Sequence, residues 1–247
     1  VRQLAALFPG MGIGPEGQFE FRPGRAEPGA ETVLGRRSGG DPARLEAIGQ
    51  ALQDLALHPA TARHIAWKLA VHFVSDTPDP ALVDHIAGRY AATGGDLRAV
   101  YAALLEHPAA WDGAAGNVKP GFDFLASACR ALAVAPEVLG QMPARRLNAL
   151  VMTPLRQMGQ GWQRPNGPNG WPEEDAAWVT PQGLSARVRW AMAAPRRLCS
   201  ELPDPRQFVT DALGPTAPEP VRFAARAAET RADAVGLVLA SPAFQRR

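Results

Sequence analysis

The sequence carries neither an excess of charge of one sign nor a long apolar run. Its 26 lysines and arginines stand against 24 aspartates and glutamates, which gives a formal net charge of +2. Proteins that follow a phosphate backbone carry dense basic tracts, so the sequence predicts that nucleic acid is not a partner. No window approaches the roughly 18 apolar residues that a membrane span needs, so we also predict no membrane span.

Cysteine is scarce. Cys129 and Cys199 are too few for a disulfide framework and lack C-x-x-C spacing. We interpret them as two buried free thiols, with a single bridge as the alternative if the protein is exported. The first residues, VRQLAALFPG, have no charged region followed by an apolar run and a cleavage site, so they are not a signal peptide. We expect a chain that is trimmed or processed at its start.

Standard catalytic motifs are absent from the sequence. It contains no G-x-S-x-G elbow, no Walker loop, no dinucleotide fingerprint and no close Asp-x-Asp cluster. The glycine-rich stretch GMGIGPEG does not stand between a strand and a helix, as a phosphate-binding loop would. The sequence therefore assigns no reaction and no cofactor.

Glycine, proline and charge are concentrated at the N-terminal end of the chain. Within residues 1–40, only QFEF and ETVL alternate as strands do. This composition predicts an irregular arm with room for one short hairpin. Residues 41–247 are interpreted as a helical domain, so the predicted fold class is all-α, a multi-helix domain with an irregular arm.

Repeated helix signals support this fold class. The segment DPARLEAIGQALQDLALH predicts a helix with Asp41 as N-cap, Pro42 at the first helical position and apolar residues at helical spacing. Many later helices also begin at a proline, where the helix amide has no partner to lose. We predict these further helices at about 59–74, 79–92, 95–107, 120–134, 142–159, 181–194, 204–213 and 218–240.

Three helix ends resemble one another. LALHPAT, LLEHPAAW and LVLASPAF each run an apolar helix end into His-Pro-Ala or Ser-Pro-Ala. Proline disfavours the helical conformation of the residue before it, so the motif predicts a repeated device that stops one helix and begins the next. Chance in an alanine- and proline-rich chain is the alternative.

The stretch HPATARHIAWKLAVHF holds three of the five histidines. A helical zinc pair needs ligands at i and i+4, and the residue four after His64 is Lys68. His58 and His72 are separated by roughly 21 Å along a helix, too far to share an ion. We therefore predict no metal site in this segment. His58 is either a polar helix start or a functional group, and His72 either a core histidine or a ligand. Lys68 either reaches solvent or acts in function.

Three tryptophans, Trp162, Trp171 and Trp178, stand in the segment GQGWQRPNGPNGWPEEDAAWVT, whose Gly, Pro and Asn content forbids a helix across it. Exposed aromatic side chains supply a large contact area at low entropic cost, so the loop is a candidate binding surface. The alternative is that the tryptophans fill the gap between helices.

Several blocks resemble one bacterial family. The stretch from His58 to Trp111, together with KPGFDFLASACRAL, LRQMGQGWQRPNGPNGWPEEDAAWVTPQGLSARVRWA and LVLASPAFQRR, is similar to successive blocks of domain of unknown function 1800. The resemblance implies a longer protein with an export signal and a further N-terminal helical region. It also implies a periplasmic or extracellular location and a chain that corresponds to the C-terminal half. A second exported family, domain of unknown function 1501, is typically encoded beside it, and that family resembles alkaline phosphatases and sulfatases.

Two function hypotheses follow. The first is a binding or scaffold protein of the cell envelope, acting with a missing N-terminal segment or a partner chain. The alternative is an enzyme whose active site the N-terminal half completes, with His58, Lys68 and His72 as candidate polar residues. Where family members commonly have a His-Asp pair and then a lysine, this chain has Ala26, Glu27 and Glu31, which weakens the enzyme hypothesis.

Overall fold

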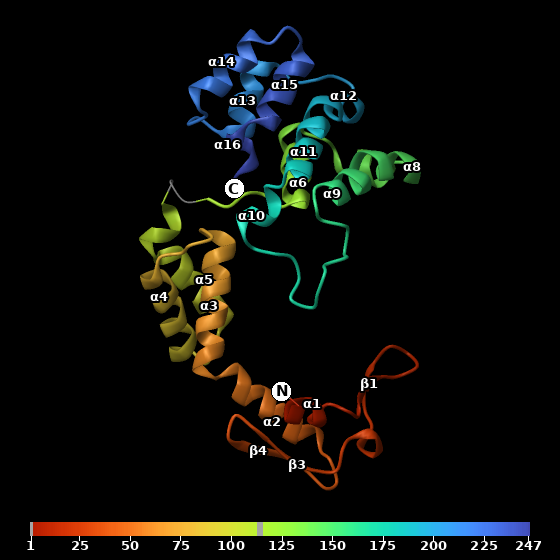
Figure 1. Cartoon of the computed structure of the whole chain (residues 1–247), viewed down its shortest axis with the longest axis vertical. Coiled ribbons are helices and arrows are strands. Elements are labelled where there is room, and N and C mark those ends of the chain that lie inside the picture. The colour runs from red at the N-terminus through yellow and green to blue at the C-terminus, as the bar shows by residue number, and fades with distance from the viewer. Residues whose placement is uncertain (1, 113–115) are drawn as a thin grey trace. The chain divides into compact units, whose positions relative to one another are not determined.

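The computed structural model describes residues 2–112 and 116–247, and the chain forms two compact units. Unit 1 holds the residues up to Ala70 together with Pro78–Trp111, and unit 2 holds Val71–Thr77 together with Asp112–Arg247. Helices dominate both units, and the named strands form two short antiparallel hairpins in the arm (Figure 1). The predicted all-α class is confirmed. Across the described ranges, no helix has both the length and the apolar content to cross a membrane.

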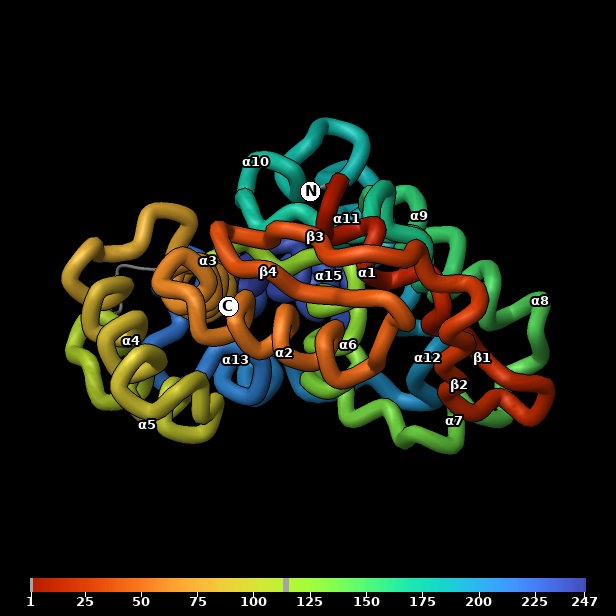
Figure 2. Tube along the Cα trace, turned by 90° about the horizontal axis from the view of Figure 1, so that it is seen from below, coloured from red at the N-terminus to blue at the C-terminus, as the bar shows by residue number. Residues whose placement is uncertain are grey.

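The arm contains more regular structure than the sequence predicts. The sequence predicts room for one hairpin, whereas the arm has two, and a short helix precedes them. Figure 2 shows the two strands of the second hairpin, β3 (Gly29–Val33) and β4 (Arg36–Gly40), side by side. The second hairpin turns at Leu34 and Gly35, both at positive φ, the backbone that a tight two-residue turn requires. Leucine is unusual there, so the turn signal in the sequence was weak. In chain order the elements are α1 (Arg2–Leu7), β1 (Met11–Ile13), β2 (Phe19–Phe21), the 3-10 turn η1 (Pro23–Arg25), β3 (Gly29–Val33) and β4 (Arg36–Gly40).

The helices of unit 1 follow the predicted order, with one corrected start. The first of them begins at Leu45 and not at Asp41, because Gly40 still pairs with Gly29 in the second hairpin and the chain must leave that ladder first. The helices α4 and α5 pack together through side chains such as Ile86 and Val100, which are fully buried. The bounds are α2 (Leu45–Ala56), α3 (Pro59–Phe73), α4 (Pro80–Ala92), α5 (Leu97–Glu106) and the 3-10 turn η2 (Pro108–Trp111). The residues of α3 from Val71 onward belong to unit 2.

Unit 2 is a helical assembly around one apolar core. The long helix α11 packs against α15, and Phe124, Phe208 and Phe244 are fully buried in that core. The bounds are α6 (Gly121–Ala131), α7 (Pro136–Gly140), α8 (Ala144–Leu147), the π-helical segment η3 (Asn148–Met152), α9 (Thr153–Gln157), α10 (Asp175–Trp178), α11 (Pro181–Ala193), α12 (Pro195–Leu198), α13 (Pro205–Leu213), α14 (Glu219–Ala227), α15 (Arg231–Ala240) and α16 (Pro242–Gln245).

Two predicted helices of unit 2 are interrupted. The predicted helix over 142–159 widens into a π-helical segment just before Pro154, which has no amide proton to continue the regular ladder. The predicted helix over 218–240 breaks into two because the Thr230 hydroxyl accepts from the Asp233 amide at 3.1 Å and caps a new helix start.

The repeated His-Pro-Ala and Ser-Pro-Ala motifs are helix caps. His58 Nδ1 accepts from the amide of Ala60 at 3.1 Å, and His107 Nδ1 accepts from the amide two residues after it at 3.2 Å. The Ser241 hydroxyl caps α16 in the same way. Each side chain satisfies an amide that would otherwise lack a partner in the first turn of a helix. The predicted device that stops one helix and begins the next is therefore present at all three places.

Replacing His58 with alanine should lower the free energy of unfolding by about 1 kcal/mol, because one amide at the start of α3 loses its acceptor. His58→Asn should retain most of the stability, since asparagine is itself a good N-cap. Urea unfolding measures both variants, and His64→Ala, at an exposed position on the same helix, is the control. Equal losses for the alanine and asparagine variants would contradict the capping role.

Candidate functional site

The β1–β2 hairpin has apolar side chains on one of its two faces. Ile13 pairs with Phe19 and Met11 pairs with Phe21. Directly paired residues project to the same side of a sheet, and alternate residues of a strand share a face. These four side chains therefore form one apolar surface, called the hairpin face below, while Glu20 belongs to the opposite face.

Most of the hairpin face is open to solvent. Ile13 is 76% exposed, Phe19 56% and Met11 40%. Phe21 is half-buried because its ring lies over Gly10, where a Cβ atom would come within 3.2 Å of the ring. An isolated two-stranded hairpin is only marginally stable in water, and adjacent exposed apolar side chains commonly mark contact surfaces. The hairpin face is thus a candidate contact surface of the arm.

His58 lines a cavity of about 190 Å³ in unit 1 together with Ser38 and Asp54. A catalytic triad needs these residue types, but its histidine must donate from Nδ1 to the carboxylate. Here Nδ1 accepts from the Ala60 amide and so carries no proton, and the Asp54 carboxylate accepts from Arg36. The arrangement fits a helix cap and not a proton relay.

His72 lies at the C-terminal end of α3. Its Nδ1 is 3.0 Å from Oε2 of Glu173 and 3.5 Å from the Arg247 guanidinium. Glu173 belongs to residues 159–180, the segment with three tryptophans, called the tryptophan loop below. The same guanidinium donates to the backbone oxygen of His72 at 3.2 Å. His72 therefore connects the tryptophan loop to the C-terminal end of the chain within unit 2. Lys68, one turn earlier on α3, is half-buried and belongs to unit 1.

The three tryptophans of the loop differ in exposure. Trp178 is buried and donates its indole N–H to the Pro172 oxygen at 3.2 Å, and Trp171 packs against it with ring centroids 6.3 Å apart. Trp162 is 49% exposed and contacts Phe122, with centroids 5.6 Å apart. Two of the tryptophans stabilise the loop, and one presents an aromatic surface.

A short antiparallel pairing fixes the chain end in unit 2. The Lys119 amide donates to the Gln245 oxygen at 2.7 Å, and the Arg247 amide donates to the Asn117 oxygen at 2.9 Å. The Asn117 side-chain amide also donates to two carbonyls in the last turn of α3, one of them that of Val71 at 2.6 Å. Those carbonyls have no partner within the helix, so this pairing also caps α3.

Two cations lie buried beneath this pairing. Arg187 is 1% exposed and donates to the Lys119 oxygen at 2.6 Å and to Gln245 Oε1 at 3.0 Å. The Lys119 ammonium donates to the Phe244 oxygen at 2.7 Å and lies 3.9 Å from the centroid of that ring. In these bonds both cations donate to uncharged oxygens and hold the chain end in place.

Burial shifts the titration of both groups. Desolvation lowers the pKa of Lys119 to about 8; the charge of Arg187 acts in the same direction, and the charge of Asp123 opposes it. Burial also lowers the pKa of Arg187 to about 10. The sequence reasoning missed these residues. The signal was available, because Arg187 stands between Gly183 and Trp190 at the spacing of a buried helix stripe.

The two cysteines are free thiols, each half-buried beside the core of unit 2. Burial raises the pKa of Cys129 to about 11, with a smaller contribution from the charge of Cys199, and burial also raises the pKa of Cys199. Thiols shifted in this direction carry little thiolate at neutral pH and are poor nucleophiles. The prediction of two free thiols is confirmed, although both side chains are half-buried and not fully buried.

Within residues 2–112 and 116–247, no three side chains of His, Cys, Asp or Glu gather as ligands of one ion would.

A family model described as "Protein of unknown function (DUF1800)" matches residues 1–246. No curated protein matches, and neither does any solved structure.

Proposed function

The chain belongs to the DUF1800 family of proteins of unknown function, and from that premise we propose that it is a binding or scaffold protein of the cell envelope. Its partner is another polypeptide, either an N-terminal segment of the same protein or a protein of the family called domain of unknown function 1501. The observation that carries the proposal is the exposed hairpin face of Met11, Ile13, Phe19 and Phe21.

The energetics of the hairpin face support a polypeptide partner. Fully burying one large apolar side chain stabilises a complex by about 1.5–3 kcal/mol, and Ile13 and Phe19 lie directly opposite each other. A pair that is 76% and 56% exposed therefore offers a compact hot spot of the kind that dominates interfaces. The strand edges beside it can also pair with an added strand.

The proposed location is the periplasm or the outside of the cell. It follows from the family resemblance, in which an export signal usually precedes the region matched here. Fractionation of the native host cells, followed by detection of the protein with an antibody, tests it. Recovery of the protein in the cytoplasmic fraction would refute this part of the proposal.

Replacing both Ile13 and Phe19 with threonine should weaken binding to the partner at least tenfold. Threonine preserves the strand preference but removes most of the apolar area, and a tenfold change corresponds to about 1.4 kcal/mol. Isothermal titration of the purified chain with a 1501-family protein from the same organism measures the effect.

Leu105→Ala is the matched control, because Leu105 is 58% exposed on α5 of the same unit. The control should bind as the wild type does. A double-threonine variant with wild-type affinity would rule out the hairpin face as the contact, and no binding by the wild-type chain would count against this partner.

A second candidate function is an enzyme, because amines with a lowered pKa also occur at catalytic sites. The observation in its favour is Lys119, with its pKa of about 8; His58, Lys68 and His72 are the polar residues that the sequence offers. We rank it second because the Lys119 amine already donates to a backbone oxygen and the residue is 9% exposed, which leaves little room for a substrate.

A further inference from the structure

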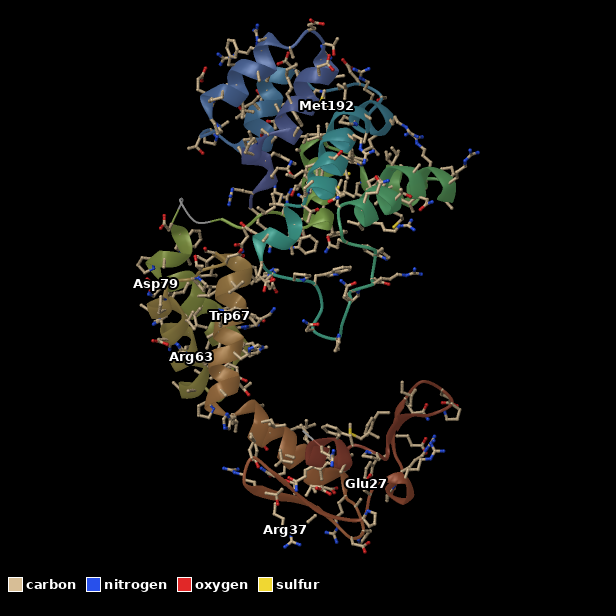
Figure 3. All side chains as sticks on the ribbon, in the orientation of Figure 1. Glu27, Arg37, Arg63, Trp67, Asp79 and Met192 are labelled. Atoms are coloured by element: carbon tan, nitrogen blue, oxygen red, sulfur yellow. The ribbon has the colours of Figure 1, made fainter. Side chains whose placement is uncertain are left out.

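A hollow of about 430 Å³ lies beside Trp67 in unit 1. Figure 3 labels Arg63 and Trp67, which lie one turn apart on α3, and Asp79, which caps the start of α4. A volume of this size is within the range of small-molecule sites in proteins. The residues that line it are Ala60, Arg63, His64 and Trp67 from α3, and Pro78, Pro80 and Val83 from the following segment.

The position of Trp67 is not explained by packing of the core. The buried side of α3 is formed by three alanines and Val71, all at most 4% exposed, whereas Trp67 is 42% exposed; the alanines are Ala62, Ala66 and Ala70. Alanines at every fourth position form one stripe of a helix, and position 67 lies outside that stripe. A large indole on the open side of the helix therefore contributes surface and not core volume.

The Trp67 indole has ring neighbours beside the hollow. The His64 ring lies 6.3 Å from it, centroid to centroid, with 29° between the planes. Pro78 and Pro80 also line the hollow, and proline rings restrict the backbone that carries them. The indole thus offers a flat platform, and neighbours that limit its motion reduce the entropy lost when a ligand binds.

The charge of Arg63, which lines the hollow, is balanced by Asp84 on α4, which is not itself a lining residue. Arg63 pairs with Asp84 at 2.6 Å, and both side chains are well exposed, at 66% and 61%. An exposed ion pair of this kind contributes little to stability, so its donors and acceptors can turn to a ligand at low cost. The Arg63 guanidinium would repel a cationic ligand, and the Asp84 carboxylate would repel an anionic one. The pair therefore favours an uncharged ligand with several hydroxyl groups.

We propose that this hollow binds an uncharged saccharide, with the apolar face of a pyranose ring against the Trp67 indole and ring hydroxyls bonded to Arg63 and Asp84. An aromatic ring beside paired donors and acceptors matches such a sugar, whose C–H groups cover one face and whose hydroxyls surround its edge. The proposal concerns a different surface from the hairpin face and does not depend on the proposed polypeptide partner.

Isothermal titration of the whole chain with cellohexaose, chitohexaose and maltohexaose tests the proposal. At least one should bind with a dissociation constant in the micromolar to millimolar range. Trp67→Ala should weaken that binding at least tenfold, and Trp67→Phe less, because phenylalanine keeps part of the platform. Trp111→Ala, at a tryptophan of the same unit that is 71% exposed, should bind as the wild type does.

Several results would overturn the proposal. These are no binding of any of the three oligosaccharides at millimolar concentration, equal binding by wild type and Trp67→Ala, or equal losses in the Trp67 and Trp111 variants. Binding of a proline-rich peptide at Trp67 without binding of a sugar would also overturn it. Circular dichroism of each variant confirms that a lost heat signal reflects the surface and not unfolding.

Discussion

Replacing Arg187 with alanine is expected to lower the free energy of unfolding of unit 2 by about 3 kcal/mol. Two hydrogen bonds from a charged donor are lost, each worth about 1.5–3 kcal/mol, and the removed side chain leaves a cavity. Part of this loss is offset, because the buried cation no longer has to be desolvated. The chain end should also loosen, since Arg187 bonds both to the Lys119 oxygen and to Gln245.

Urea unfolding followed by far-UV circular dichroism measures the change in stability. Arg189→Ala is the matched control, because Arg189 is exposed two residues away. Arg187→Met should keep more stability than the alanine variant, since methionine refills the space without a buried charge. A loss of less than about 0.5 kcal/mol for Arg187→Ala, the size of an ordinary surface substitution, would show that the chain end does not depend on this residue.

Raising the pH from 7 to 10 is expected to stabilise the wild type relative to Lys119→Met by about 2 kcal/mol. The folded pKa of Lys119 is about 8, and the ordinary pKa of a lysine is 10.5. Between these values the unfolded chain binds more protons than the folded chain, so stability rises with pH. Each unit of pKa difference corresponds to about 1.4 kcal/mol, which sets the size of the effect.

The comparison with Lys119→Met is needed because other groups titrate in the same window. The pKa of Cys129 is raised to about 11, so this thiol makes stability fall with pH above about 9, the opposite sign. That contribution is common to both proteins and cancels in their difference. Parallel pH profiles of unfolding free energy for wild type and variant would contradict a desolvated Lys119 amine.

Local signals in the sequence predict much of the helical fold. Proline after a capping residue marks the starts of α4 and α13, where Asp79 and Asp204 accept from amides of the first turn. The interpretation of His58 as a polar helix start is also confirmed by its bond to the Ala60 amide. These features depend on residues close together in the chain, and short-range spacing can reveal them.

Features that depend on distant residues could not be predicted in this way. The pairing of residues 117–119 with 245–247 joins segments far apart in sequence, and no spacing rule indicates it. The burial of Lys119 follows from that pairing. The hairpin face could not be predicted for a different reason. QFEF indicates one strand, but the partner strand that begins at Met11 has only three residues, too few to show an alternating pattern.

Hydrogen exchange across the arm tests the central claim, that the hairpin face contacts a partner polypeptide. In the isolated chain, the amides of residues 11–21 should exchange rapidly, because a two-stranded hairpin opens easily. Adding the 1501-family protein in excess should slow that exchange at least tenfold and leave the β3–β4 hairpin unchanged. Unchanged exchange at residues 11–21, or protection confined to the tryptophan loop, would contradict the account.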